Sequence, residues 1–272
     1  MINFQNIGSE AFLSENLSEI EKFYETDIKH HRIHASGNLF LSAIELPAPE
    51  GTSGVSADDS SNTLVIIAGR AESEHKYAEL LYSLKDTGIR VIVAFVRGQG
   101  KSTPVLYDSN KCHVERFLHY RADFENILSY LDVGPNFKLL GFSTNYPHKP
   151  KALVLIAPFL GINFLLPPKV VYPILKTLCN FRPFALSYTP FGKEYERIPF
   201  EENIHSHSQL RYKLYHDYYV KNPELALAGP TYKFVRCCMQ AQLRLNRIKC
   251  NFDFPTLCMS AGADMVVSTT AA

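Results

Sequence analysis

The residue best suited to covalent chemistry in this sequence is Ser143, which ends the tripeptide Gly-Phe-Ser at residues 141–143. It directly follows an apolar run at residues 137–140. A serine placed in Gly-x-Ser at the end of such a run is half of a nucleophile elbow, a tight turn that exposes a serine hydroxyl above a sheet. The complete motif is Gly-x-Ser-x-Gly, whereas Asn145 stands here in the last position. A serine hydroxyl is a weak nucleophile until a neighbouring base takes its proton, so the chemistry also requires a base and fixed oxyanion donors.

The elements that must hold Ser143 follow from the apolar patterning. We expect a helix at 10–25, a hairpin at 30–35 and 39–46, strands at 63–68, 90–96, 137–140 and 152–157, and helices at 76–87 and 119–131. Strands that alternate with helices in this way predict a parallel sheet with helices on its faces. Active groups lie at the carboxyl ends of such strands, so the loops at 69–73, 97–102 and from Ser143 onward are expected to meet.

The segment after Pro158 changes character. Residues 159–240 are rich in aromatic residues and proline, with helices expected at 169–178, 206–220 and 232–245. We interpret this segment as a helical cap, or lid, over the carboxyl edge of the sheet. An apolar strand at 255–260 then returns to the core. The expected division is therefore an N-terminal part of the core at 1–158, a cap at 159–245 and a truncated return to the core at 246–272.

The net charge, the cysteine content and the lack of long apolar stretches disfavour several classes of protein. The net charge of +1 gives no electrostatic reason to expect nucleic acid as a partner. Six cysteines without a Cys-x-x-Cys pair indicate reduced thiols. The N-terminus lacks the pattern of a signal peptide, and no apolar stretch reaches the length of a membrane span, so we expect a cytoplasmic protein.

Two further patterns could suggest bound ligands. His30, His31 and His34 are close in sequence, but strand alternation places His31 on the opposite face from the other two, which disfavours a metal site. The glycine-bearing turn at 97–102 lacks the spacing of a phosphate-binding loop. The sequence therefore predicts no metal and no cofactor.

Six motifs in order carry a resemblance to a known family: AGRAES, RGQGKS, HVERFLHYRADF, LLGFS, KALVLIAPFLGI and GADMVVS. Over roughly residues 20–268 the chain resembles an α/β-hydrolase of the lysophospholipase L2 and monoacylglycerol lipase group, the serine aminopeptidase S33 domain. The cap segments HSHSQLRY and GPTYKFVR are most similar to the lysophospholipase L2 branch.

The resemblance implies a mostly parallel sheet with flanking helices and a helical cap, and hydrolysis of acyl esters of single-chain lipids by a Ser-His-Asp triad. It places the nucleophile at Ser143 and the triad acid at Asp264. The oxyanion donors it implies are the backbone N–H groups of Arg70 and Thr144. The implied substrate is a lysophospholipid or monoacylglycerol, with peripheral contact at the inner face of a membrane.

Three departures from the family pattern bear on activity. Only residues 144–151 separate two strands that should be joined by a helix, and since a parallel crossover usually needs about a dozen residues or more, the short link favours an antiparallel turn or a distorted loop. No histidine follows Asp264; the last in the sequence is His216, in the cap, and the final strand and helix of the family are missing. Phe95 and Val96 stand where the family usually has Asp-His, a change expected to alter only local packing.

Three hypotheses therefore remain open. The first is that the chain is an esterase of the lysophospholipase type that acts through Ser143. A cap histidine (His205, His207 or His216) in place of the missing base is disfavoured, because cap helices usually carry such residues as solvated or capping groups. Alternatively, the chain is a hydrolase by descent that is impaired or inactive, which is the interpretation we favour. The third hypothesis is a non-catalytic module that binds an acyl chain or a protein partner.

Overall fold

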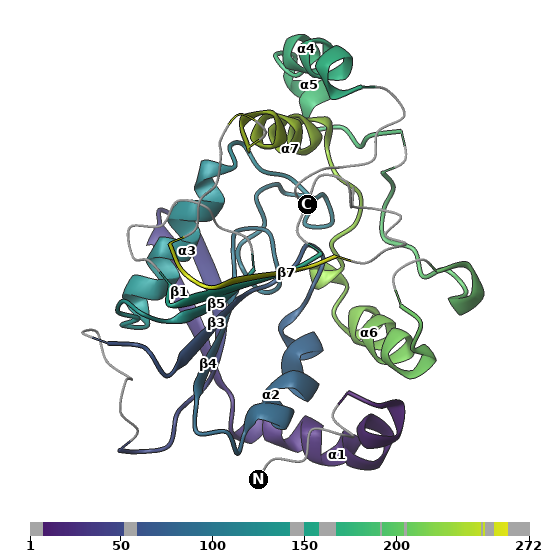
Figure 1. Cartoon of the computed structure of the whole chain (residues 1–272). Coiled ribbons are helices and arrows are strands. Elements are labelled where there is room, and N and C mark those ends of the chain that lie inside the picture. The colour runs from purple at the N-terminus through teal and green to yellow at the C-terminus, as the bar shows by residue number, and fades with distance from the viewer. Residues whose placement is uncertain are drawn as a thin grey trace.

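The structure is a computed structural model that describes residues 8–51, 59–141, 150–157, 167–190, 192–203, 206–245, 247 and 253–260. In this part of the chain, one sheet has the strand order β1-β2-β4-β3-β5-β6-β7 (Figure 1). β2 is antiparallel to both of its neighbours, and the pairs from β4 to β7 are parallel. The strands are β1 (Lys29–Ser36), β2 (Leu39–Leu46), β3 (Thr63–Ile67), β4 (Arg90–Phe95), β5 (Lys138–Leu140), β6 (Ala152–Ile156) and β7 (Thr256–Met259). The predicted hairpin and mostly parallel sheet are confirmed.

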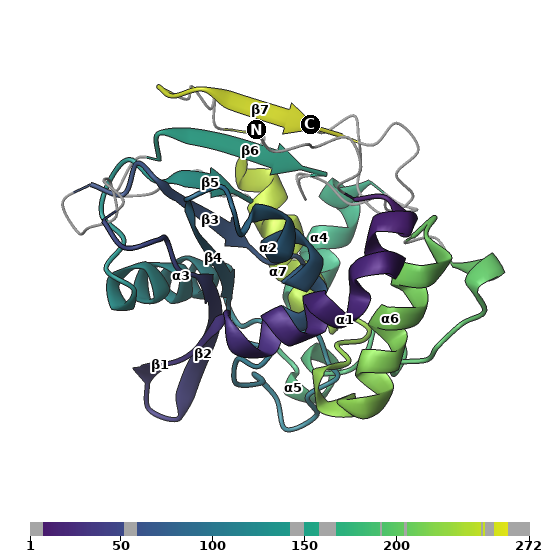
Figure 2. The ribbon, with the colours of Figure 1, turned by 90° about the horizontal axis from the view of Figure 1, so that it is seen from below.

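Helices cover both faces of the sheet (Figure 2). They are α1 (Glu10–Thr26), α2 (Ala78–Leu84) and α3 (Leu118–Tyr130). Every residue of β4 is buried, because its apolar side chains alternate between two cores. Ile92 of β4 lies in the same buried cluster as Ile127 of α3, on one face. On the other face, Val93 lies in a cluster with Ile20 of α1 and Leu81 of α2.

The helix predicted at 76–87 differs from the observed one at both ends. The chain enters it earlier, as a 3-10 helix, η1 (Glu74–Tyr77), and α2 ends at Leu84. After Leu84 the chain turns, and Gly88 adopts a φ of 73° that favours glycine. The helices predicted at 10–25 and 119–131 are confirmed as α1 and α3.

The pairing of β5 with β6 corrects one expectation. The two strands are parallel, with Lys138 opposite Ala152, so the predicted antiparallel turn is wrong. The ladder involves only three residues of β5, and the chain therefore has to return only a short way along the sheet. An extended chain covers roughly 3.3–3.6 Å per residue, so the residues between Leu140 and Ala152 can span that return without a helix. Residues 142–149 lie outside the described residues.

Between β6 and β7, the regular elements of the described residues are helices. The helices predicted at 169–178, 206–220 and 232–245 correspond to α4, α6 and α7, whereas α5, η2 and η3 are too short to be predicted from periodicity. Leu210 and Leu214 of α6 pack against the core cluster that holds α1 and α2. The elements are α4 (Pro168–Leu178), α5 (Arg182–Ala185), η2 (Phe200–Glu202), α6 (Gln209–Lys221), η3 (Pro223–Leu225) and α7 (Tyr232–Leu245). The division of the chain into core and cap stays a prediction.

Helix α4 presents apolar side chains to solvent. Val170, Ile174 and Leu178, spaced four residues apart on one face, are 52%, 55% and 44% exposed. In the described part of the chain, each helix is too short or too polar to cross a lipid bilayer.

Candidate active site

The ends of β3 and β5 lie side by side at the carboxyl edge of the sheet. Ile66 pairs with Leu140 in the parallel register, so Gly141 comes directly beside Ile67. Gly141 has a φ of 146°, and a Cβ built on it would lie 2.9 Å from the Cβ of Ile67. Only glycine fits there, which explains the first position of the Gly-Phe-Ser tripeptide. The Gly141 N–H donates to the Val154 carbonyl at 3.0 Å, so the strand end is fixed on both sides.

Of the predicted site residues, only Arg70 lies in the described part of the chain. It stands in the loop between β3 and η1, and its side chain is exposed. Ser143, Thr144 and Asp264 lie outside the described residues, as does Asn145. Their roles, and the role of the Arg70 backbone, stay predictions.

Fixed contacts flank the backbone N–H of Arg70 on both sides. The Gly69 N–H donates to Glu72 Oε2 at 2.6 Å, and the Ala71 N–H donates to Gln99 Oε1 at 3.1 Å. The Arg70 N–H between them makes no hydrogen bond with any other described residue. Ala71 has a φ of 60°, which costs a non-glycine residue about 1 kcal/mol. The loop is thus held in an unusual conformation that leaves one N–H donor without a partner in this region.

Glu72 organises the loop from within. Besides the Gly69 N–H, its carboxylate accepts from Tyr77 Oη and Lys76 Nζ, each at 2.5 Å. Burial alone would raise the pKa of Glu72, but the Lys76 ammonium and these hydrogen bonds outweigh it and hold the pKa below its ordinary value. Burial and the neighbouring carboxylate raise the pKa of Tyr77. Glu72 is therefore ionised and Tyr77 neutral at neutral pH, and this pair acts as a fixed acceptor and donor.

The turn after β4 supports the first loop. Its Arg97 side chain pairs with Asp123 of α3, a carboxylate with no exposed surface, at 2.6 and 2.8 Å. The same carboxylate accepts the Arg97 N–H at 3.0 Å. Two residues further along, Gln99 provides the carbonyl that holds Ala71. The contacts therefore run from α3 through this turn to the loop that carries Arg70.

A buried carboxylate ties the same turn to β2. Glu74 accepts from Ser42 Oγ and from the Lys101 N–H, both at 2.7 Å. A Cβ on Gly100 would meet Glu74 Oε1 at 2.6 Å, so glycine is required beside this carboxylate.

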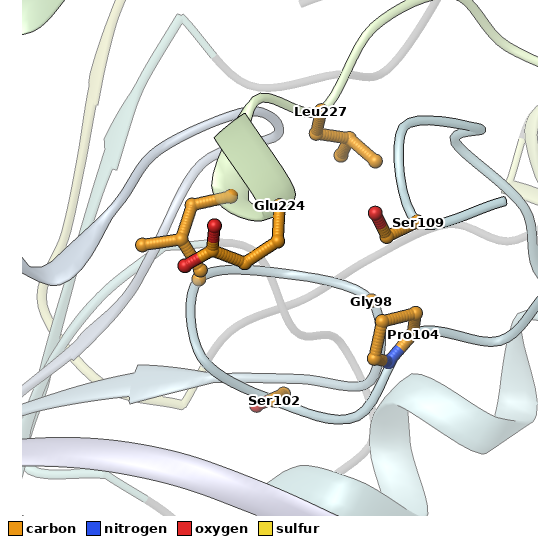
Figure 3. Close-up of a pocket in the computed structure, with 8 residues that line it drawn as sticks. Gly98, Ser102, Pro104, Ser109, Glu224 and Leu227 are labelled. Carbon is orange, nitrogen blue, oxygen red and sulfur yellow. The ribbon is translucent and has the colours of Figure 1, made fainter. Parts of the chain in front are cut away.

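A small cavity lies where the turn after β4 faces η3 (Figure 3). Its lining residues are Gly98, Gly100, Ser102, Pro104, Ser109, Glu224, Leu225 and Leu227. The Ser102 hydroxyl is already committed, because it donates to the Phe95 carbonyl and accepts from the Ser42 N–H. The cavity therefore lies between this turn and the residues around η3, and the Ser102 hydroxyl has no further proton to offer in it.

The cap histidines were predicted alternatives for the missing base. His216 is buried among tyrosines, and its Nδ1 is hydrogen-bonded to the Tyr195 hydroxyl. This contact engages one ring nitrogen of His216 within the cap segment. His207 lies before α6, and His205 lies outside the described residues. Because Ser143 and His205 both lie outside the described residues, this alternative stays a prediction.

Histidines in the hairpin have separate partners. His31 bonds to Glu45, His34 to the Gly37 carbonyl, and His30 approaches the Tyr24 carbonyl. Among the described residues, no group of three or more His, Cys, Asp or Glu side chains is arranged to hold a metal ion.

The strand order and the loops at the carboxyl edge define an α/β-hydrolase fold, and solved structures of that fold superpose on the chain. A soluble variant of monoglyceride lipase from Saccharomyces cerevisiae, in complex with a substrate analog, matches with a TM-score of 0.61 and 17% identity. That match covers 90% of this chain and 80% of the lipase. The monoacylglycerol lipase of Paleococcus ferrophilus matches with a TM-score of 0.59 and 17% identity, over 85% and 81% of the two chains.

The chain belongs to the serine aminopeptidase, S33 family, whose model matches residues 58–272. Lysophospholipase L2 of Escherichia coli strain K12 is 31% identical over 219 residues, which cover 75% of this chain and 64% of that protein. The probable lysophospholipase L2 of Haemophilus influenzae is 29% identical over 218 residues, covering 75% and 68%. The match thus spans about two thirds of the length of these relatives.

Of the residues that hold the loop around Arg70, the sequence indicated only Glu72, which together with Ser73 was expected to help shape this loop. Glu72 stands within the quoted AGRAES motif, but its role depends on a turn that returns its side chain to Gly69. Asp123 and Gln99 act across long sequence separations, and no local pattern marks them. A polar residue on the inward face of an otherwise apolar helix was the one signal that could have indicated Asp123.

Proposed function

We propose that this chain is a serine ester hydrolase of the lysophospholipase type, with Ser143 as nucleophile and Asp264 as the triad acid. The backbone N–H groups of Arg70 and Thr144 are the proposed oxyanion donors. The parallel pairing of β3 with β5 carries this proposal, because it sets Gly141 against Ile67. The residues after Gly141 and the loop after Ile67 therefore start from adjacent points. The Arg70 N–H makes no hydrogen bond with any other described residue, which supports its assignment as a donor.

The reaction follows from these assignments. The Ser143 hydroxyl attacks the acyl carbonyl carbon while a base takes its proton, and the resulting oxyanion is stabilised by the two N–H donors. Collapse of this tetrahedral adduct breaks the ester bond, and the departing alcohol receives the proton. Water then attacks the acyl-serine, which releases the fatty acid and restores the hydroxyl.

The base determines how fast this chain reacts. The family places its triad histidine beyond the acid, and residues 265–272 contain none. We therefore propose that a polypeptide of these 272 residues is impaired: the oxyanion donors and substrate binding remain, and they support only a residual rate.

Labelling by a fluorophosphonate probe, with and without added imidazole, tests both parts of the proposal. Slow labelling that imidazole accelerates, and that Ser143→Ala abolishes, is expected, because free imidazole can act as the missing base. Labelling that persists in Ser143→Ala would rule out Ser143 as the nucleophile. A chain that melts cooperatively, yet is never labelled, would instead favour a non-catalytic module that binds an acyl chain or a protein partner.

The proposed substrate is a lysophospholipid or a monoacylglycerol, in line with the names of the relatives. We further propose that the exposed face of α4 contacts a lipid surface peripherally. Between Asp132 and Glu194 the sequence has no acidic residue, whereas Lys169 and Lys176 lie on α4 itself. An apolar helical face flanked by basic residues favours an anionic lipid interface.

Co-sedimentation with anionic vesicles checks the role of α4. Ile174→Glu is expected to lower the bound fraction several-fold, because it places a carboxylate on the exposed apolar face. Leu118→Glu, at a 61% exposed leucine of α3, is the matched control and should bind like the unaltered chain. Equal binding by both variants would show that α4 does not make the contact.

A further inference from the structure

The loop that carries Arg70 is held from outside by helix α6. The hydroxyl groups of Tyr215 and Tyr219 both donate to the Ala71 carbonyl, the latter at 3.0 Å. Tyr219 is 2% exposed, so its hydroxyl meets Ala71 in a region from which water is largely excluded. A buried donor, Tyr219, and a partly buried one, Tyr215, thus converge on one carbonyl oxygen of this loop.

The Ala71 carbonyl belongs to a residue whose backbone conformation is unfavourable by itself. Ala71 has a positive φ although it carries a Cβ, a conformation that persists only where the surroundings fix it. Its N–H is held by Gln99 and its C=O by the two tyrosines. With both polar groups of Ala71 fixed, the two peptide planes that follow the Arg70 Cα are held in place, and the Gly69 N–H is held on the other side, which restricts how the Arg70 N–H can turn.

Helix α6 is itself attached to the core and can therefore act as a support. The Arg211 guanidinium makes two hydrogen bonds to the Glu79 carboxylate of α2, at 2.6 and 2.9 Å, and a third to the Gly8 carbonyl at 2.7 Å. The Arg70 side chain also links the loop to the chain after η3, since its Nη1 donates to the Ala228 carbonyl at 2.9 Å.

We propose that Tyr215 and Tyr219 are positioning residues for the oxyanion donor: through Ala71, they set the direction of the Arg70 N–H. This inference rests on the proposed function, because the Arg70 N–H matters to catalysis only if Ser143 is acylated nearby. Neither tyrosine touches the reacting atoms. Their effect is to keep the donor in place before substrate arrives, so that no reorganisation is needed when charge develops.

The double variant Tyr215→Phe/Tyr219→Phe tests this proposal, because it removes both hydroxyls and keeps both rings. Tyr218→Phe is the matched control: Tyr218 lies on the same helix and stacks on His75, but its hydroxyl makes no hydrogen bond to the loop in the described structure. Two quantities are measured in the full chain, namely backbone hydrogen exchange over residues 69–73 and the imidazole-assisted rate of fluorophosphonate labelling.

The double variant should exchange about tenfold faster at residues 69–73. Its labelling should be about tenfold to a hundredfold slower, less than or comparable to the loss of a whole oxyanion donor. Tyr218→Phe should match the unaltered chain in both measurements. A purely structural role of the tyrosines would lower the melting temperature without slowing the labelling of the folded chain.

Exchange and labelling that stay unchanged in a folded double variant would overturn the proposal. If the unaltered chain is not labelled at all, the proposed function fails, while the exchange measurement still decides whether the tyrosines hold the loop. If the double variant does not melt cooperatively, the single variant Tyr215→Phe takes its place, with the same two measurements and the same criteria.

Discussion

Asp123→Asn is expected to lower the free energy of unfolding by about 3–5 kcal/mol, the range for removing one partner of a buried ion pair. The Asp123 carboxylate has no exposed surface, and it accepts from the side chain and the N–H of Arg97. An amide of the same shape is neutral and has one oxygen fewer to accept these bonds. The guanidinium would then be left in a largely buried position without its counter-charge.

Urea unfolding of the variant checks this expectation, with Glu125→Gln as control. Glu125 lies on the same helix and pairs with Arg121, but both side chains are more than one third exposed, so this change should cost less than about 0.5 kcal/mol. A loss below about 1 kcal/mol for Asp123→Asn would contradict the assigned role. Because Arg97 begins the turn that carries Gln99, the variant should also loosen the loop around Arg70.

Because of Glu45, the free energy of unfolding is expected to fall when the pH is lowered into the acid range. Glu45 lies on β2, 6% exposed, between Arg90 and His31, with contacts of 2.7 Å to each. Burial alone would raise its pKa, but the hydrogen bond from His31 and the charge of Arg90 outweigh it and lower the pKa to about 2. Because the folded pKa lies below the ordinary value of 4.5, the stabilisation is complete above pH 4.5 and is lost as the pH falls toward 2.

The ionised Glu45 carboxylate contributes on the order of 3 kcal/mol to the free energy of unfolding, since each unit by which its pKa is lowered corresponds to about 1.4 kcal/mol. Glu45→Gln should remove this contribution at pH 7. The difference in the free energy of unfolding between the variant and the unaltered chain should shrink to about half or less by pH 3. Denaturant unfolding of both at a series of pH values measures that difference. A constant difference from pH 7 to pH 3 would show that ionisation of Glu45 contributes nothing.

Most of the fold was predictable because its strands are unusually apolar. Residues 64–68 and 91–96 are uninterrupted apolar runs, as expected of buried parallel strands. Helix α2 was less predictable, because its start depends on the loop contacts of Glu72 and Glu74 rather than on periodicity. An antiparallel turn before β6 was one of the two alternatives that the sequence left open, and it is wrong, since the rule for crossover length assumes longer strands than the three paired residues of β5.

At the candidate site, the sequence predicted a nucleophile and an oxyanion donor in the loop after β3, and both assignments stay predictions because Ser143 lies outside the described residues. The Gly-Phe-Ser tripeptide and the family motifs indicated Ser143 and the Arg70 backbone. The supports of that loop are contacts between residues far apart in the chain, such as Tyr215 with Ala71, and no local pattern of residues reports them. Arg90 was predicted only as the first residue of an apolar strand, whereas in the structure it lies against Glu45 and donates to the Leu131 carbonyl.

The contacts of α6 also impose an order on folding. Tyr215 and Tyr219 lie 144 and 148 residues beyond Ala71, and Arg211 lies 203 residues beyond Gly8. Contacts over such separations form late, because a long loop must close before they contribute. At roughly 5–20 residues per second, a ribosome needs on the order of ten seconds between synthesis of the loop and synthesis of its supports. The sheet can begin to form in that interval, whereas the loop that carries Arg70 reaches its native conformation only after α6 has emerged and docked.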